Sequence, residues 1–192
     1  MADEPLADFG GKTPLQMAEK PEIDNLAKRG RAGLLKTVPD DMHPGSEIAN
    51  LSVLGYDVPS VFEGRGVLEA ASIGVTLAEG DLALRCNLIC LENGNIKNHS
   101  AGHISNEESY ELIEFLNKKL GNDIIKFYPG VSYRHLLVIK GGKKQLNCTP
   151  PHDVPGKPFR PCLIQPENVE SAATAKLLNY LILRSQALLA EH

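Results

Sequence analysis

The stretch from residue 105 to residue 140 constrains the fold more than any other part of the sequence. It reads SNEESYELIEFLNKKLG, then a short turn, Asn122-Asp123, and then two apolar runs, IIKFY and VSYRHLLVIK, which Pro129-Gly130 separates. Ser105 and Glu108 have the spacing of a capping box, apolar residues recur every three or four positions, and a glycine ends the run, which predicts a helix. The two apolar runs predict a strand pair joined at Pro129-Gly130. Together they indicate a compact unit of mixed helices and antiparallel strands.

Segments on both sides extend this unit. LALRCNLICLE, residues 82–92, predicts a strand that turns at Asn93-Gly94-Asn95 into a weaker partner, IKNHS. Six prolines between Pro150 and Pro166 predict a long loop, because proline cannot continue a helix or a central strand. The final segment, residues 167–192, has apolar residues at helical spacing and predicts a closing helix.

The beginning of the chain is poorer in strands than in helices. PEIDNLAKRG, residues 21–30, predicts a helix, and RAGLLKTV, residues 31–38, predicts a short strand. Further helices are predicted from about Ser46 to Leu54 and in GRGVLEAASIG. We therefore interpret residues 1–76 as pieces of an α/β sheet domain, residues 77–163 as a compact α+β unit with hairpins, and residues 164–192 as a C-terminal helix.

Composition and charge exclude several classes of function. The 192 residues carry a formal net charge of −4, and no run of lysine and arginine is longer than a pair, so we expect no nucleic-acid partner. No stretch approaches the length of about 18 apolar residues that a membrane span requires, and the N-terminus lacks a signal pattern. The four cysteines form no Cys-x-x-Cys pair, which is typical of a cytoplasmic protein.

The residues that carry chemistry are suited to anions. Ser46 stands at a predicted helix start, where backbone N–H groups and the helix dipole favour negative charge. Arg65, Arg85 and Arg134 lie in or beside apolar or glycine-rich segments, and a guanidinium binds phosphate or carboxylate through two hydrogen bonds. Strand alternation in SYRHLLVIK places His135 on the opposite face from Arg134, together with Tyr133.

Each of these residues also has a purely structural interpretation. Ser46 can be a helix cap, the arginines can be solvated surface groups, and His135 can be a core histidine. Gly11-Lys12-Thr13 lacks the earlier glycine of a phosphate-binding loop, and the histidines show no zinc-like spacing. The residues alone thus leave both interpretations open.

A series of segments resembles one protein family, in order and over nearly the whole chain. They are MADEPL, GGKTPLQ, PEIDNLAKRGRAGLLKTVP, PGSEIANLSVLGYD, GRGVLEAASIG, RCNL, SAGHIS, FYPGVSYRHLL and PPHDVPGKP. The family is the archaeal-type 2,3-bisphosphoglycerate-independent phosphoglycerate mutases of the alkaline phosphatase superfamily, some of whose bacterial relatives are labelled homoserine kinases. The resemblance implies that residues 1–76 are part of an alkaline-phosphatase-like core and that residues 77–163 are an inserted α+β cap. Residues 164–192 are then either a C-terminal helix of the cap or the return to the core.

The resemblance also implies an activity and a set of site residues. Members interconvert 3-phosphoglycerate and 2-phosphoglycerate in glycolysis and gluconeogenesis, through a phosphoserine intermediate and with two divalent ions, manganese or magnesium. The matching positions make Ser46 the nucleophile and a metal ligand. Substrate-binding candidates are Arg65, Arg85, His103, Arg134 and His135.

The family's first core strand and its remaining metal ligands have no counterpart in this sequence. We therefore expect an N-terminal portion of such an enzyme, with a complete cap and no activity or bound metal of its own. Two alternatives stay open: a non-catalytic module that binds phosphorylated acids, and a related metal-dependent phosphatase or phosphotransferase. The expected partner is a small phosphorylated acid; the sequence leaves homo-oligomerisation open.

Overall fold

The computed structural model describes residues 4–191 and divides the chain into two compact units, residues 1–60 and residues 61–192. Residues 1–3, which begin the MADEPL motif, lie outside the described residues, as does His192. Between residues 4 and 191, no helix combines the length and the apolar character that crossing a membrane would require.

The first unit is built of short helices. They are a 3₁₀ turn (Ala7–Phe9), α1 (Pro14–Met17), α2 (Pro21–Arg29), α3 (Ser46–Val53) and α4 (Val58–Val61), which runs across the division between the units. The predicted helices at residues 21–30 and near residues 46–54 are therefore confirmed. Pro21 begins α2, where its missing N–H costs nothing, and Gly30 follows its last residue.

The strand predicted at residues 31–38 is wrong. This segment is extended but forms no strand, and the side chain of Leu34 is fully exposed at 100%, with Leu35 at 69%. A strand needs a neighbour for its N–H and C=O groups. No strand is formed anywhere in the described part of the first unit, so the segment has none. The apolar composition of residues 31–38 is typical of a strand, but composition does not show whether a second strand is there to pair with it.

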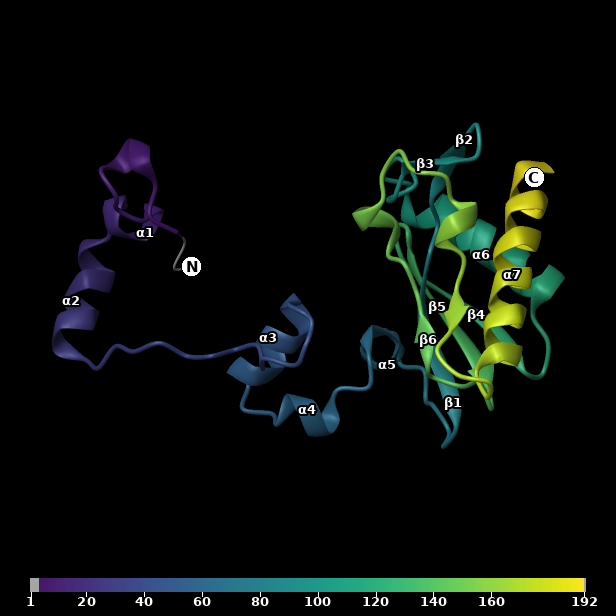
Figure 1. Cartoon of the computed structure of the whole chain (residues 1–192), viewed down its shortest axis with the longest axis horizontal. Coiled ribbons are helices and arrows are strands. Elements are labelled where there is room, and N and C mark those ends of the chain that lie inside the picture. The colour runs from purple at the N-terminus through teal and green to yellow at the C-terminus, as the bar shows by residue number, and fades with distance from the viewer. Residues whose placement is uncertain (1–3, 192) are drawn as a thin grey trace. The chain divides into compact units, whose positions relative to one another are not determined.

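The second unit is organised around a three-stranded antiparallel sheet (Figure 1). Its strands, in spatial order, are β1 (Asp81–Asn87), β5 (Arg134–Lys140) and β4 (Ile125–Val131). Two small antiparallel pairs accompany it: β2 (Cys90–Glu92) with β3 (Asn95–Asn98), and β6 (Leu146–Asn147) with β7 (Gln165–Pro166). The predicted mixed α and β architecture with antiparallel strands is confirmed.

The structure differs from the predicted hairpins in two details. The single strand expected over residues 82–92 is divided, because β1 ends at Asn87 and β2 begins at Cys90. The chain between β4 and β5 reverses at Ser132-Tyr133, not at Pro129-Gly130, which lies where the pairing register shifts within β4. Ser132 has a positive φ of 53°. Its hydroxyl donates to the carbonyl of Ile104 over 2.9 Å, which compensates for this backbone conformation.

Helices cover both faces of the sheet. On one face lie α6 (Asn106–Leu120) and α7 (Ala172–Glu191), whose buried side chains pack with alternate residues of the strands. This main core contains Leu82, Ile113, Leu116, Ile125, Phe127, Leu137, Ile139, Leu178 and Leu181. On the other face α5 (Arg65–Ser72) packs through Ala70 against Leu136 and Val138. The capping box of Ser105 and Glu108 at the start of α6 is confirmed.

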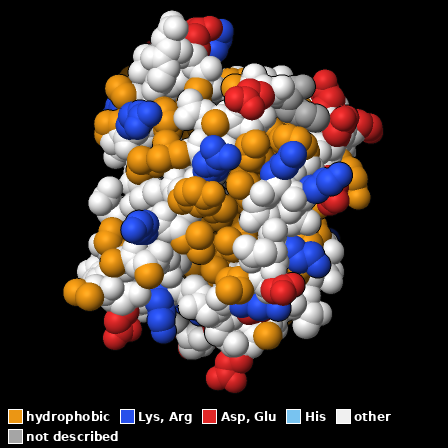
Figure 2. All heavy atoms as spheres, turned by 90° about the vertical axis from the view of Figure 1, so that its right-hand side faces the viewer, with side chains coloured by type: hydrophobic (Ala, Val, Ile, Leu, Met, Phe, Trp, Pro, Cys, Tyr) orange, Lys and Arg blue, Asp and Glu red, His pale blue; other side chains and the backbone are white. Residues whose placement is uncertain are grey.

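The long helix α7 also presents apolar side chains on its outer side. Tyr180 is 53% exposed and Ile182 is 36% exposed, whereas Leu178 and Leu181 are buried in the core. Figure 2 shows this side of the molecule, where hydrophobic side chains gather in the middle of the face and lysine and arginine side chains lie around them. One side of α7 thus packs in the core, and the outer side carries exposed apolar side chains.

The proline-rich segment forms a strap, defined here as residues 150–159, across the β2–β3 hairpin. Backbone N–H groups of Ile96 and Phe159 donate to Lys157 and Gly94 over 2.9 and 3.0 Å, and Gly156 donates to Ile96 over 2.8 Å. The Phe159 side chain is 7% exposed. Three backbone hydrogen bonds and one buried aromatic ring therefore hold a segment that has little regular structure of its own.

The predicted domain boundary at residues 76 and 77 differs from the division of the chain after Ser60. The reason is α5, which packs against β1 and β5 and so lies within the second unit. The assignment of residues 1–76 to a catalytic core and of residues 77–163 to a cap stays a prediction.

Candidate functional site

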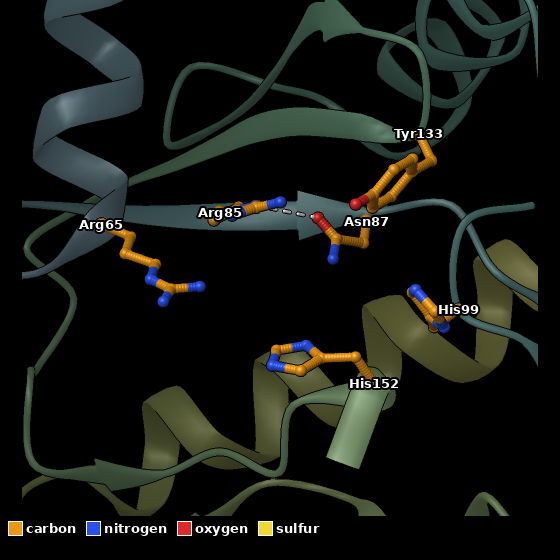
Figure 3. Close-up of a pocket in the computed structure, with 6 residues that line it drawn as sticks. All are labelled: Arg65, Arg85, Asn87, His99, Tyr133 and His152. Carbon is orange, nitrogen blue, oxygen red and sulfur yellow. Dashed lines mark hydrogen bonds between the residues drawn. The ribbon is translucent and has the colours of Figure 1, made fainter. Parts of the chain in front are cut away.

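A pocket of about 270 Å³ lies in the second unit (Figure 3). Its lining comes from five separate places in the chain: α5, β1, the turn between β4 and β5, the loop after β3, and the 3₁₀ turn Pro151–Asp153. The residues that line it are Arg65, Arg85, Asn87, His99, Tyr133 and His152. The pocket therefore depends on the tertiary fold and not on any single motif.

One end of the pocket is formed by two arginines. Arg65 is the first residue of α5, and Arg85 lies on β1, whose alternation places Asn87 on the same face. The Arg85 Nε donates to Asn87 Oδ1 over 3.3 Å and lies 3.7 Å from Glu69 Oε1. These two contacts engage Nε, so the terminal N–H groups of Arg85 are the ones suited to a ligand.

The close approach of α5 to β1 sets the position of the arginines. Gly66 is buried within the first turn of α5, and a Cβ atom built on it would lie 2.0 Å from the backbone oxygen of Ala83. No side chain fits between these two backbones. The glycine therefore lets the helix rest directly on the strand, with Arg65 beside it and Glu69 one turn later.

The other end of the pocket is aromatic and comes from the hairpin and the strap. His99 follows β3, and its ring meets the ring of Tyr133 edge-on at 6.3 Å between centroids. The ring of His152, on the strap, lies 6.3 Å from that of His99. His152 Nε2 is 3.3 Å from Asp153 Oδ1, with side chains 49% and 55% exposed.

This combination of groups is suited to a small molecule that carries both anionic groups and hydroxyls. Guanidinium groups bind phosphate or carboxylate in a fixed fork geometry. Imidazole, amide and phenol groups donate and accept hydrogen bonds, and imidazole also exchanges protons near neutral pH. Among residues 4–191, no group of three or more His, Cys, Asp or Glu side chains is arranged to hold a metal ion.

The structure brings together two of the residues singled out from the sequence, Arg65 and Arg85. His103, Arg134 and His135 do not line the pocket. His103 is exposed in a turn with φ of 61°, and Arg134 is exposed with its guanidinium 5.7 Å from the centre of the Tyr133 ring. Their roles in substrate binding stay predictions.

Ser46 begins α3 and is exposed. Gly45 occupies the N-cap position, with φ of −155°, and as a glycine makes no side-chain capping hydrogen bond. The interpretation of Ser46 as a helix cap is therefore wrong by one position: its hydroxyl is not used in closing the helix. Ser46 lies in the first unit and the pocket in the second.

His135 is enclosed in the sheet, with 2% of its surface exposed. Its Nδ1 accepts a hydrogen bond from the N–H of Gly130 over 3.0 Å, so the neutral ring carries its proton on Nε2. Nε2 has no hydrogen-bond partner in the described residues. Burial lowers the pKa of His135 to about 4, because the charged ring would lose its hydration.

This environment predicts that the second unit loses stability as the pH falls from 6.5 to 4. The unfolded chain binds a proton at His135 with the ordinary pKa of 6.5, and the folded chain does so only near 4. The contribution is complete above pH 6.5 and lost below pH 4, and its full size is about 3 kcal/mol. Urea unfolding of the wild type and of His135→Asn, whose amide oxygen can replace Nδ1, measures it.

The His135→Asn variant should show a shallower pH dependence than the wild type over this range. His103→Gln is the matched control, since His103 is exposed, and it should keep the wild-type slope. Equal slopes for His135→Asn and the wild type would show that His135 titrates alike in both states.

Four pocket residues were not identified from the sequence: Asn87, His99, Tyr133 and His152. Asn87 could have been found, because it stands two positions after Arg85 on a predicted strand. No spacing rule connects the two histidines, which are brought together only by the strap on the hairpin.

Comparisons with known proteins show the family of the chain. A family profile described as 2,3-bisphosphoglycerate-independent phosphoglycerate mutase matches residues 27–192. The chain belongs to this family. A mutase of that description from Methanosarcina barkeri is 54% identical over 158 residues, which are 82% of this chain and 40% of the relative. Another from Methanothrix thermoacetophila is 43% identical over 192 residues, covering 100% of this chain and 47% of the relative.

Solved structures agree with this assignment. The cofactor-independent phosphoglycerate mutase of Thermoplasma acidophilum matches all of this chain with a TM-score of 0.57 and 28% identity, over 50% of its own length. A protein from Pyrococcus horikoshii matches all of it with a TM-score of 0.66 and 26% identity, over 42% of its own length. The chain thus spans half or less of the relatives that it matches.

Proposed function

We propose that this chain supplies the nucleophile and a substrate-binding pocket to a phosphoglycerate mutase that interconverts 3-phosphoglycerate and 2-phosphoglycerate. Membership of the family supports the reaction. The observation that carries the proposal is the pairing of Arg65 and Arg85 in one pocket, together with hydrogen-bonding groups for hydroxyls. Phosphoglycerate has the matching chemistry: two anionic groups and one free hydroxyl on three carbons.

Ser46 is proposed as the residue that carries the phosphoryl group between the two substrate oxygens. It is exposed at the start of the eight-residue helix α3, where N–H groups stabilise a bound phosphate. A serine hydroxyl is a weak nucleophile unless it is deprotonated, and divalent manganese or magnesium supplies this activation in the proposed reaction. The described residues do not form a metal site by themselves, so the metal requirement is a question for activity measurements.

A hybrid enzyme tests the proposal. In it, this chain replaces the matching segment of the Methanothrix thermoacetophila relative, which aligns over all 192 residues. Formation of 2-phosphoglycerate is followed by coupling to enolase, with and without EDTA and with added Mn²⁺ or Mg²⁺. We expect turnover that EDTA abolishes and the metal restores. Inorganic phosphate as the sole product would indicate a phosphatase, and turnover that resists EDTA would contradict the metal requirement.

Arg85→Ala should raise the KM of the hybrid enzyme for 3-phosphoglycerate by about 10- to 100-fold. This range corresponds to the loss of a hydrogen-bonded charge pair of about 1.5–3 kcal/mol. Arg85 is 22% exposed and therefore partly shielded from water, which supports an effect of this size. Arg184→Ala is the control, because Arg184 is an exposed residue of α7 and does not line the pocket. A KM for Arg85→Ala within threefold of the control would remove this pocket from the proposal.

A further inference from the structure

Asn87 is the last residue of β1 and lies on the same face of the strand as Arg85, two positions earlier. Both side chains line the pocket, and Figure 3 shows them beside each other along the strand. Asn87 is half-buried, so its amide is partly removed from water. A polar group in such a place is stabilised by partners in the protein or in a bound ligand.

The hydrogen bond with Arg85 fixes the direction in which the Asn87 amide faces. A guanidinium has only N–H donors, so the partner of Arg85 Nε must be the amide oxygen, at a distance of 3.3 Å. The Glu69 carboxylate lies 3.7 Å from the same nitrogen, beyond hydrogen-bond distance, and adds a negative charge. Since Oδ1 faces Arg85, the Asn87 nitrogen points away from it, into the open space between the labelled side chains (Figure 3).

The Asn87 nitrogen carries two N–H donors that no residue between 4 and 191 accepts, because the hydrogen bonds of the described residues engage only its amide oxygen. The terminal N–H groups of Arg85 are likewise suited to a ligand, since Nε is engaged. These two neighbouring side chains therefore offer the pocket donors only. A phosphate or carboxylate oxygen, which accepts several hydrogen bonds at once, fits such a pair.

Building on the proposed function, we propose that Asn87 binds the anionic group of the ligand through Nδ2 while its oxygen holds Arg85. An amide is suited to both tasks because it carries an acceptor and two donors. A carboxylate in its place would hold Arg85 and repel the anion. As a neutral donor, Asn87 also avoids the repulsion that a third cation beside the two arginines would bring.

The first test is a titration of the 192-residue chain, followed in proton–nitrogen correlation spectra at the Asn87 amide. The probes are 3-phosphoglycerate, glycerol 3-phosphate, which has only the phosphate, and glycerate, which has only the carboxylate. We expect the Asn87 Nδ2 signals to shift with 3-phosphoglycerate and with at least one of the other two, which identifies the anionic group. If all three probes leave these signals in place, the inference is overturned.

Two substitutions separate ligand binding from simple support of Arg85. Asn87→Ala removes both tasks and should raise the Kd for 3-phosphoglycerate by about 3- to 10-fold. Asn87→Asp keeps an oxygen for Arg85 Nε but turns a charged oxygen toward the ligand, so it should raise the Kd by roughly 30-fold or more. If Asn87 only holds Arg85, Asn87→Asp should bind better than Asn87→Ala, and that order would overturn the inference.

Asn147→Asp is the matched control, because Asn147 is exposed, ends β6 and does not line the pocket. It adds the same charge far from the ligand, so its Kd should stay within about twofold of the wild type. An equal loss in this control would assign the effect to net charge and contradict a role for Asn87. The backbone signals of each spectrum verify the fold.

Exchange of the Arg85 Nε–H with water tests the assigned amide orientation without any ligand. It should be faster in Asn87→Ala than in the wild type and unchanged in Asn87→Asp, which keeps the acceptor. Unchanged exchange in Asn87→Ala would overturn the orientation and with it the inference. None of these measurements requires turnover. The hybrid enzyme decides the mutase proposal separately, so either can fail while the other holds.

Discussion

Ser46→Ala is expected to abolish turnover of the hybrid enzyme, lowering kcat by at least about 10⁴-fold. The reason is chemical: without the hydroxyl, residue 46 has no oxygen to form the covalent phosphoserine intermediate. Stability should change by less than about 0.5 kcal/mol, because Ser46 is exposed and does not cap α3.

Rapid quenching with 3-phosphoglycerate labelled in its phosphoryl group measures this directly. The wild-type hybrid should retain label on Ser46, which peptide mapping locates, and Ser46→Ala should retain none. Ser52→Ala is the matched control, because Ser52 lies on the same helix α3 and should change neither labelling nor kcat. Undiminished turnover in Ser46→Ala, or label on another residue, would contradict the proposed nucleophile.

Two variants together separate the chemical step from substrate binding. Ser46→Ala should remove kcat while 3-phosphoglycerate still binds, whereas Arg85→Ala should raise KM. The two residues lie in different compact units of the chain. The effect of Arg85→Ala on KM is therefore measured with Ser46 intact, because a variant without turnover has no measurable KM, and binding of 3-phosphoglycerate to Ser46→Ala is measured directly by calorimetry.

The elements that the sequence predicted correctly are those with local signals. The helix α6 has a capping box at Ser105 and Glu108 and apolar residues at helical spacing, and both are set by neighbours within four positions. The extended segment at residues 31–38 has equally clear composition but forms no strand. Pairing requires a second strand brought by another part of the chain, and no local pattern reports on that.

The turn between β4 and β5 was misplaced for a related reason. Pro129-Gly130 has the composition of a turn, yet it lies at a shift of register within β4, and the reversal falls on Ser132. Ser132 tolerates φ of 53° because Ile104 and Asn106, about 26 positions earlier, accept its hydrogen bonds. Tertiary contacts here outweigh the preference of proline and glycine for turns.

For the site, residue chemistry was informative and residue spacing was not. Arg65 and Arg85 could be singled out because guanidinium groups beside apolar segments suit anions, and both line the pocket. His99 and His152 were not identified, since only the strap, fixed to the hairpin by Phe159 and backbone hydrogen bonds, brings them together. His135 was ambiguous in the sequence, and the structure shows it enclosed in the sheet.

Gly66→Ala is expected to destabilise the second unit by about 2 kcal/mol or more. The added Cβ would lie 2.0 Å from the backbone oxygen of Ala83 and 2.4 Å from its carbonyl carbon. Neither atom can move aside as a flexible side chain could, so α5 must shift away from β1. Alanine is by itself favoured over glycine within a helix by about 1 kcal/mol, so a net loss isolates the contact between helix and strand.

Urea unfolding of the chain measures the loss, and Gly33→Ala is the control. The φ of Gly33 lies outside the positive region that strains alanine, and nothing lies within 4 Å of a Cβ built there, so stability should change little. In the hybrid enzyme, Gly66→Ala should also raise the KM for 3-phosphoglycerate, because α5 carries Arg65 and the Glu69 that contacts Arg85. Wild-type stability with unchanged KM would mean that the close contact of α5 with β1 is not what positions the arginines.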